Sequence, residues 1–228
     1  MLPAAEHANC VSPRHNSSLG ATPVITFRPA LPQDWASVLP LIYSSGPEQF
    51  EYLFTQPGRP AQRFLQSAFV SGVGLFGYRV YTVALVEQRP VAIGGAYGRR
   101  EGKALKQQML IQILRFYGLR AAWPVIRHAI ALDAMMPFPE PDMFYFAQLG
   151  VAETMRGQGI GTAWLQYQIR QARERGYQRC ALDVASTNPR AQALYERVGF
   201  RVTGERAWPH SASGTHMPNM RRMELRLS

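Results

Sequence analysis

The chain has 228 residues, of which 46% are hydrophobic and 18% charged, as expected of a globular protein with an apolar core. This composition excludes a predominantly disordered chain, and the 19 Gly and 17 Pro follow no period that would indicate a collagen or linker sequence. The chain has 25 Lys and Arg against 15 Asp and Glu, a formal charge of +10 that is carried almost wholly by arginine. Such a charge is compatible with binding to nucleic acid, to an anionic membrane surface or to a phosphorylated small molecule, and also with a merely solvated surface.

The cysteines and the first 20 residues indicate in which cellular compartment the protein is expected. Cys10 and Cys180 lie far apart without neighbouring metal-ligand residues, so we expect no metal site and no disulfide framework. Residues 1–20 lack the apolar segment of a secretory signal, and no stretch approaches the roughly 18 consecutive apolar residues that cross a membrane. We therefore expect a cytoplasmic protein without a membrane partner.

The first half of the chain predicts a leader followed by short strands and helices. Residues 1–22, rich in Pro, Ser, His and Asn, are expected to form a flexible leader before a single α/β domain over residues 23–228. The elements expected next are a strand over 24–28, a helix capped by Asp34 and ending before Pro47, a helix over 60–71, and hairpin strands over 78–86 and 90–97.

Residues 99–142 are predicted to form a helical insertion. Apolar residues recur at helical spacing over 99–136, which predicts two helices that separate after Arg120. The insertion either shapes a substrate site or covers a sheet face, where it could also form a homodimer surface. The side chains that it offers to a substrate are Trp123, His128, Met135, Met136 and Phe138.

The second half of the chain alternates strands and helices. The expected elements are a strand over 143–151, a helix over 160–175, a strand over 180–184, a helix between Asn188 and Gly199, and closing strands over 200–206 and 220–227.

A glycine-rich turn lies between the strand at 143–151 and the helix after it. Glycines let the backbone approach a ligand closely, and the free N–H groups of a helix start favour an anionic group such as a pyrophosphate. The dinucleotide fingerprint fails, because Thr162 or Trp164 stands where its third glycine or alanine is required. The P-loop pattern also fails, because no Gly-Lys-Ser/Thr ending is present. What remains is R-x-x-G-x-G, formed by Arg156, Gly159 and Gly161.

With Leu149, Gly150 and Val151 before it, this turn resembles the acetyl-CoA motif of the GNAT N-acetyltransferase superfamily. A second block, from Asn188 to Phe200, is similar to that family's N-x-x-A-x-x-L-Y-x-x-x-G-F signature. The resemblance implies an α/β fold with a mixed, mostly antiparallel sheet of six to seven strands flanked by helices, and with the insertion between the third and fourth strands. The long insertion resembles, loosely, the puromycin-type branch that acetylates small amines.

The resemblance also implies roles for individual residues. Tyr195 would be the general acid that protonates the CoA thiolate after an amine attacks the thioester directly in a ternary complex. The residues expected to bind acetyl-CoA are Leu149, Gly150, Val151, Arg156, Gly157, Gln158, Gly159, Ile160, Gly161, Thr162, Asn188 and Ala191.

The general base is not identified by the sequence. Protein-lysine members of the family commonly carry a glutamate in the strand before the glycine turn, whereas here the polar residues of that strand are Tyr145 and Gln148. Glu140 and Asp142 precede the strand and are interpreted as solvated loop charges rather than as bases.

The leading interpretation is acetyl transfer from acetyl-CoA to an amine of a small molecule. Because residues 99–136 carry seven basic and two acidic side chains, a neutral or anionic acceptor fits better than a polyamine. A protein N-terminal or lysine acetyltransferase is the alternative, and a non-catalytic acyl-CoA sensor is a function of a different class. Nucleic acid is not expected as a partner, because no recognised binding motif accompanies the arginines.

Overall fold

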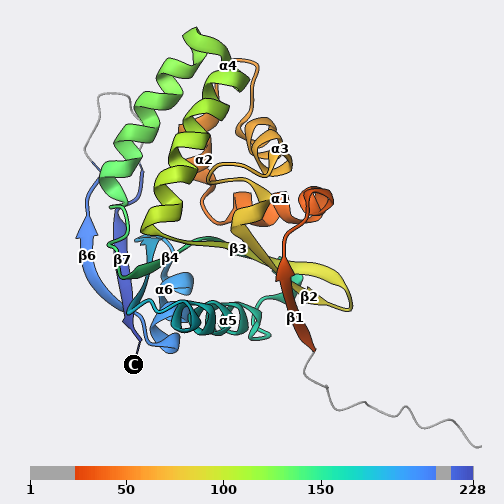
Figure 1. Ribbon diagram of the computed structural model, residues 1–228, viewed down its shortest axis with the longest axis vertical. Coiled ribbons are helices and arrows are strands. Elements are labelled where there is room, and N and C mark those ends of the chain that lie inside the picture. Colours follow the sequence, from red (N-terminus) through yellow and green to blue (C-terminus); the bar gives the residue numbers. More distant parts are fainter. Residues whose placement is uncertain (1–23, 209–216, 228) are drawn as a thin grey trace, which may run out of the picture.

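The computed structural model describes residues 24–208 and 217–227, which form one seven-stranded sheet with helices on both faces (Figure 1). The predicted leader at 1–22 lies outside the described residues. The strands are β1 (Ile25–Pro29), β2 (Tyr81–Val86), β3 (Arg89–Gly98), β4 (Met143–Val151), β5 (Arg179–Ala185), β6 (Arg201–Arg206) and β7 (Met220–Arg226). They lie in the order β1-β2-β3-β4-β5-β7-β6, and only the β4–β5 pair is parallel. This mixed, mostly antiparallel sheet confirms the predicted fold class.

Two layers of helices cover the sheet. The helices are α1 (Trp35–Ser44), α2 (Pro47–Phe54), α3 (Ala61–Ser71), α4 (Arg99–Met135), α5 (Ile160–Glu174) and α6 (Pro189–Val198). The first four share a core with β2 and β3 that contains Val38, Phe64 and Tyr81. Helices α5 and α6 pack on the opposite face, where Trp164 is fully buried. No helix within 24–208 and 217–227 is both long and apolar enough to span a membrane.

Helix α4 is a hairpin of two arms rather than one rod (Figure 1). The break lies at Gly118, whose φ of 75° and ψ of 164° are not helical. The arms lie side by side, and Lys106 on the first places its Nζ 2.7 Å from a carboxylate oxygen of Asp133 on the second. Two helices between β3 and β4 were predicted, but the predicted break after Arg120 is wrong by two residues.

The structure corrects two further predictions near the N-terminus. Helix α2 was not predicted, and it begins at Pro47, directly after the break that ends α1. The Asp34 side chain does not cap α1: its carboxylate accepts from the Leu31 N–H (2.7 Å) and from the guanidinium of Arg28. An ion pair with β1 and a turn contact therefore take the place of the expected cap.

The parallel pair β4–β5 opens along its length, and this opening creates the site. Their register runs only from Met143 opposite Arg179 to Tyr145 opposite Ala181. Beyond that point β4 pairs with β3 alone, because β5 turns toward β7. Gln148 adopts a φ of 48° at a register shift of β4, so a bulge bends the strand where the two strands part.

Candidate active site

A cavity of about 710 Å³ lies in the opening between β4 and β5. The free edge of β4 from Phe146 to Val151 lines it, and so do the start of α5 and one face of α6. A strand edge without a partner offers its backbone N–H and C=O groups to an extended ligand, which can add to the sheet as a further strand.

The glycine turn brings a helix N-terminus to one end of this cavity. Gly157 and Gly159 have φ values of 81° and 79°, a backbone conformation that only glycine adopts at low cost. The Ala163 N–H donates to the Gly159 carbonyl (2.9 Å), so the amides of residues 160–162 precede the first intrahelical bond of α5. These free N–H groups and the helix dipole favour an anionic group at this point.

Arginines add positive charge to the wall of the cavity. Arg156 lines it and donates through Nε to the Val151 carbonyl (3.2 Å), which fixes the turn to the end of β4. Arg190 and Arg197 line it from α6. The arrangement of free amides and guanidinium groups fits the phosphates of a CoA-type ligand.

Helix α6 carries the second motif into the cavity. Asn188 caps the helix, accepting from the Ala191 N–H through its side-chain oxygen (3.0 Å). Tyr195 is half-buried and lines the cavity, and burial raises the pKa of its hydroxyl to about 12. The phenol therefore keeps its proton at neutral pH and can give it to a stronger base.

The structure brings nearly all of the predicted site residues together. Those that line the cavity are Leu149, Gly150, Val151, Arg156, Gly157, Gly159, Ile160, Gly161, Thr162, Asn188, Ala191 and Tyr195. Gln158 is the exception: its amide donates to the Thr154 carbonyl (3.2 Å) and holds the turn. Gly150 also touches α1, because a Cβ there would lie 2.0 Å from the Leu41 carbonyl oxygen.

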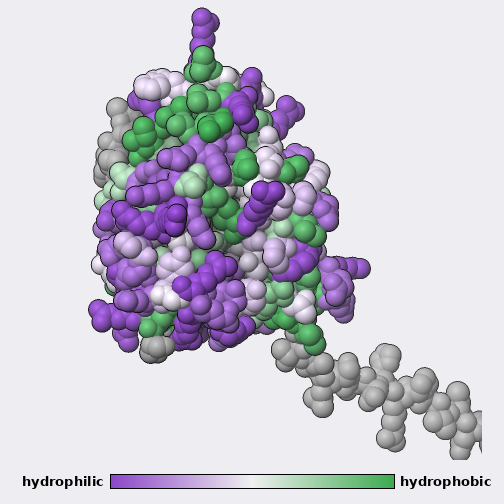
Figure 2. Space-filling model, viewed as in Figure 1, coloured by the Kyte–Doolittle hydropathy of each residue, from purple (hydrophilic) through white to green (hydrophobic). Residues whose placement is uncertain are grey.

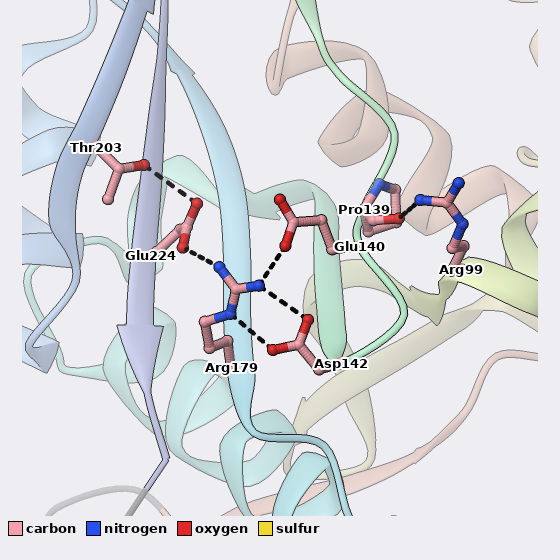
Figure 3. Close-up of polar contacts among 7 residues, drawn as sticks. All are labelled: Arg99, Pro139, Glu140, Asp142, Arg179, Thr203 and Glu224. Atoms are coloured by element: carbon pink, nitrogen blue, oxygen red, sulfur yellow. Dashed lines mark hydrogen bonds and ion pairs between the residues drawn. The ribbon is translucent and has the colours of Figure 1, made fainter.

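The two carboxylates that precede β4 take part in an ion-pair network instead of the cavity (Figure 3). Arg179 pairs with Glu140, with Asp142 (2.8 Å) and with Glu224 (3.0 Å). The guanidinium lowers the pKa of Asp142, so that carboxyl is a poor base at neutral pH. The network ties the start of β4 to β5 and β7 and holds the closed end of the opening.

A buried polar cluster that the sequence did not reveal lies at the bottom of the opening. The Tyr145 hydroxyl donates to Asp183 Oδ2 (2.8 Å), and Arg222 donates to both oxygens of the same carboxylate (2.9 Å each). Asp183 and Tyr145 line the cavity, and the side chains of Asp183 and Arg222 are 2% and 7% exposed. The three residues come from β4, β5 and β7, so no local pattern could join them.

The insertion contributes part of the cavity wall. Met136 and Phe138 line the cavity, as the sequence suggested. Met135 is buried in the core, His128 stacks on Tyr52 with ring centres 4.2 Å apart, and Trp123 is 63% exposed away from the site. The insertion therefore covers the sheet and also walls the cavity, and its part in substrate binding or in a homodimer stays a prediction.

Comparison with known proteins decides the family. Residues 48–200 match the acetyltransferase (GNAT) family over most of the described domain. The chain belongs to the GNAT acetyltransferase family. It is accordingly an acyltransferase of the family that uses acetyl-CoA as co-substrate. No curated protein matches the chain in sequence.

Solved GNAT structures share the fold at low sequence identity. An N-acetyltransferase from Staphylococcus aureus Mu50 superposes with a TM-score of 0.61 and 16% identity, covering 88% of this chain and 100% of that one. A polyamine N-acetyltransferase of Drosophila melanogaster, which forms N-acetylagmatine, gives 0.55 and 20%, covering 90% and 100%. An agmatine N-acetyltransferase gives 0.54 and 20%, covering 89% and 99%. Identities this low establish the shared fold alone.

Proposed function

We propose that the protein transfers an acetyl group from acetyl-CoA to the amine of a small molecule by direct attack in a ternary complex. The observation that carries the proposal is that the free edge of β4, the start of α5 with its free amides, and Tyr195 all line one cavity. That cavity is large enough to hold a pantetheine arm and a small acceptor together.

Each part of the cavity has a role in this reaction. The backbone at Leu149 and Val151 would hold the pantetheine arm, and the amides of residues 157–162 would hold the pyrophosphate with Arg156 beside them. The nitrogen lone pair attacks the thioester carbonyl carbon, the C–S bond breaks, and Tyr195 gives its proton to the sulfur. Because burial keeps the pKa of Tyr195 near 12, the acid is protonated throughout the physiological range.

Replacing Tyr195 by Phe tests the general acid. We expect kcat to fall by about 100-fold, since general acid catalysis contributes at least that much, while the Kd for CoA stays within about a factor of three. Turnover is followed by free thiol release, and CoA binding by calorimetry. Tyr167→Phe is the matched control, because Tyr167 of α5 stacks on Phe27 of β1 and does not line the cavity. An unchanged kcat in the Tyr195 variant would remove the assigned acid.

Two other functions make different predictions in the same assay. A non-catalytic acyl-CoA sensor would bind CoA and turn over no acceptor. A protein acetyltransferase would prefer a peptide with a free N-terminus or lysine to any small amine. A cytoplasmic location and a homodimer stay predictions from the sequence, which fractionation and light scattering would test.

A further inference from the structure

The cavity has an acceptor end, formed by the helical layer over the sheet, where eight apolar side chains line it beside the polar Ser44, Ser45, Gln49, Lys106 and Asp133. It lies across the opening from the glycine turn, with walls from α1, α2, the α4 hairpin and the segment after it. The apolar residues that line it are Phe50, Leu53, Leu75, Phe76, Met109, Leu132, Met136 and Phe138. Such a wall favours a ligand with an uncharged body of carbon atoms.

The charges that line the cavity disfavour a polycation. Among the described residues that line it, only Asp133 and Asp183 are acidic, against four Lys and Arg side chains. Both carboxylates already have a cation: Lys106 lies 2.7 Å from Asp133, and Arg222 lies 2.9 Å from Asp183. A second ammonium group of a polyamine would therefore enter the cavity without an unpaired carboxylate to meet it, which carries a desolvation cost.

Of the polar side chains that line the cavity, Tyr145 and Asp183 lie at the point where β4 and β5 part. Tyr145 lies at the last paired position of β4, and Asp183 lies two residues beyond its partner Ala181 on β5. Tyr145 lines the cavity, and because its hydroxyl hydrogen is committed to Asp183, its oxygen keeps its lone pairs for a further donor. The Arg222 guanidinium holds the carboxylate in place and lies 5.3 Å over the Tyr145 ring.

We propose that the acceptor is a primary amine on an uncharged apolar body. In this proposal the Tyr145 oxygen accepts a hydrogen bond from the ammonium group of the acceptor and relays a proton from that group to Asp183. This inference rests on the proposed acetyl transfer and names its substrate class. Tyr145 and Asp183 would together act as the general base, as a glutamate on β4 does in other members of the family. Here the carboxylate lies on the neighbouring strand β5.

The proton balance of the step is complete. The bound ammonium gives one proton to the Tyr145 oxygen while the Tyr145 hydroxyl proton moves to Asp183 Oδ2. The neutral nitrogen then forms the C–N bond as the C–S bond breaks. Tyr195 protonates the thiolate and regains a proton from the nitrogen as the amide forms. The products are the amide, the thiol and one proton, which Asp183 returns to water.

The electrostatics of the cluster support this direction of transfer. Burial raises the pKa of Asp183 above its ordinary value, although the contacts with Arg222 and Tyr145 and the charge of Arg206 oppose the shift. Burial also raises the pKa of Tyr145 well above its ordinary value, with the charge of Asp183 and the nearby Tyr97 acting in the same sense. Tyr145 therefore stays neutral and relays a proton, while Asp183 is the group that can store it.

A panel of acceptors tests the substrate class with the full chain and acetyl-CoA. We expect hexylamine and 2-phenylethylamine to have kcat/KM values at least about tenfold above those of spermidine, agmatine and a lysine peptide. A preference for spermidine, agmatine or the peptide would overturn this inference and leave the acetyl transfer standing. CoA binding without turnover of any amine would instead overturn the proposed function.

Tyr145→Phe separates the proton relay from a purely structural role. The variant keeps the ring beside Tyr97 and Arg222 and removes only the hydroxyl. We expect kcat for hexylamine, an ammonium with a pKa of ~10.4, to fall at least about tenfold, and kcat for aniline, which binds already neutral, to change little. Tyr177→Phe is the control, because Tyr177 stacks on Phe144 on the opposite face of β4. Equal losses for both amines, or no loss for either, would contradict the relay.

Discussion

Cys180 and Asp183 lie three residues apart on β5, yet they face opposite layers and differ in what they can do. Cys180 points into the core beneath α5, is 0% exposed, and burial raises the pKa of its thiol to about 12. Asp183 faces the cavity within hydrogen-bonding distance of Tyr145. The alternation of a strand thus places a buried thiol behind a carboxylate that lines the cavity.

The thiol of Cys180 is expected to be unreactive in the folded protein. In a Cys10→Ser variant Cys180 is the single cysteine left. At about pH 8 the thiol is almost wholly protonated, because burial raises its pKa, and the surrounding core also excludes the reagent. We expect no reaction with Ellman's reagent in buffer and complete reaction in guanidinium chloride. Rapid labelling without denaturant would show that this part of the core opens.

The α4 hairpin is the longest part of the helical layer, and its turn depends on one backbone position. Gly118 turns the chain between the arms with a positive φ and an extended ψ, a combination that is almost confined to glycine. Arg59 donates to the carbonyls of Phe116 (2.9 Å) and Tyr117 (3.2 Å) and so satisfies the end of the first arm. Figure 2 shows apolar side chains gathered over this end of the molecule, where Leu119 and Trp123 are exposed.

Replacing Gly118 by Ala is expected to destabilise the protein by about 1–3 kcal/mol, the cost of a side chain in this region of backbone space. No atom lies within 4 Å of the added Cβ, so the loss would come from backbone strain and not from a clash. The free energy of unfolding is measured by urea titration. Gly204→Ala is the control, because its Cβ also meets nothing within 4 Å and its φ is ordinary. Equal stability of the two variants would show that the turn can rearrange.

Elements with a clear start and stop could be predicted, and elements without them could not. The caps at Asn188 and Gly199 place α6 correctly, and the uncharged run at 143–151 places β4. Helix α2 was missed because eight residues are too few for a convincing repeat and it starts inside a break. The chemistry of Asp183 was missed for a different reason. Its neighbours Tyr145 and Arg222 are distant in sequence, and only the sheet order brings them together.

Over the whole molecule, part of the excess positive charge comes from arginines that line the cavity. Arg156, Arg190 and Arg197 line the same cavity as the free amides of α5. Apolar side chains of the helical layer line the same cavity, and its two carboxylates, Asp133 and Asp183, pair with Lys106 and Arg222. On the proposed function, the cavity would hold the CoA phosphates beside these arginines and the acceptor among the apolar side chains, and the formal +10 need not indicate a polyanion.

This division predicts that CoA binding depends on salt through its phosphates alone. Raising the ionic strength from about 50 mM to about 0.5 M shortens the screening length severalfold, so we expect the Kd for CoA to rise several-fold. Pantetheine, which has the same arm without the phosphates, should bind more weakly, with a Kd that hardly changes with salt. Calorimetry on both ligands makes the comparison. An Arg190→Gln variant should reduce the salt dependence for CoA and leave pantetheine unaffected. Equal responses of the two ligands would place the phosphates away from these arginines.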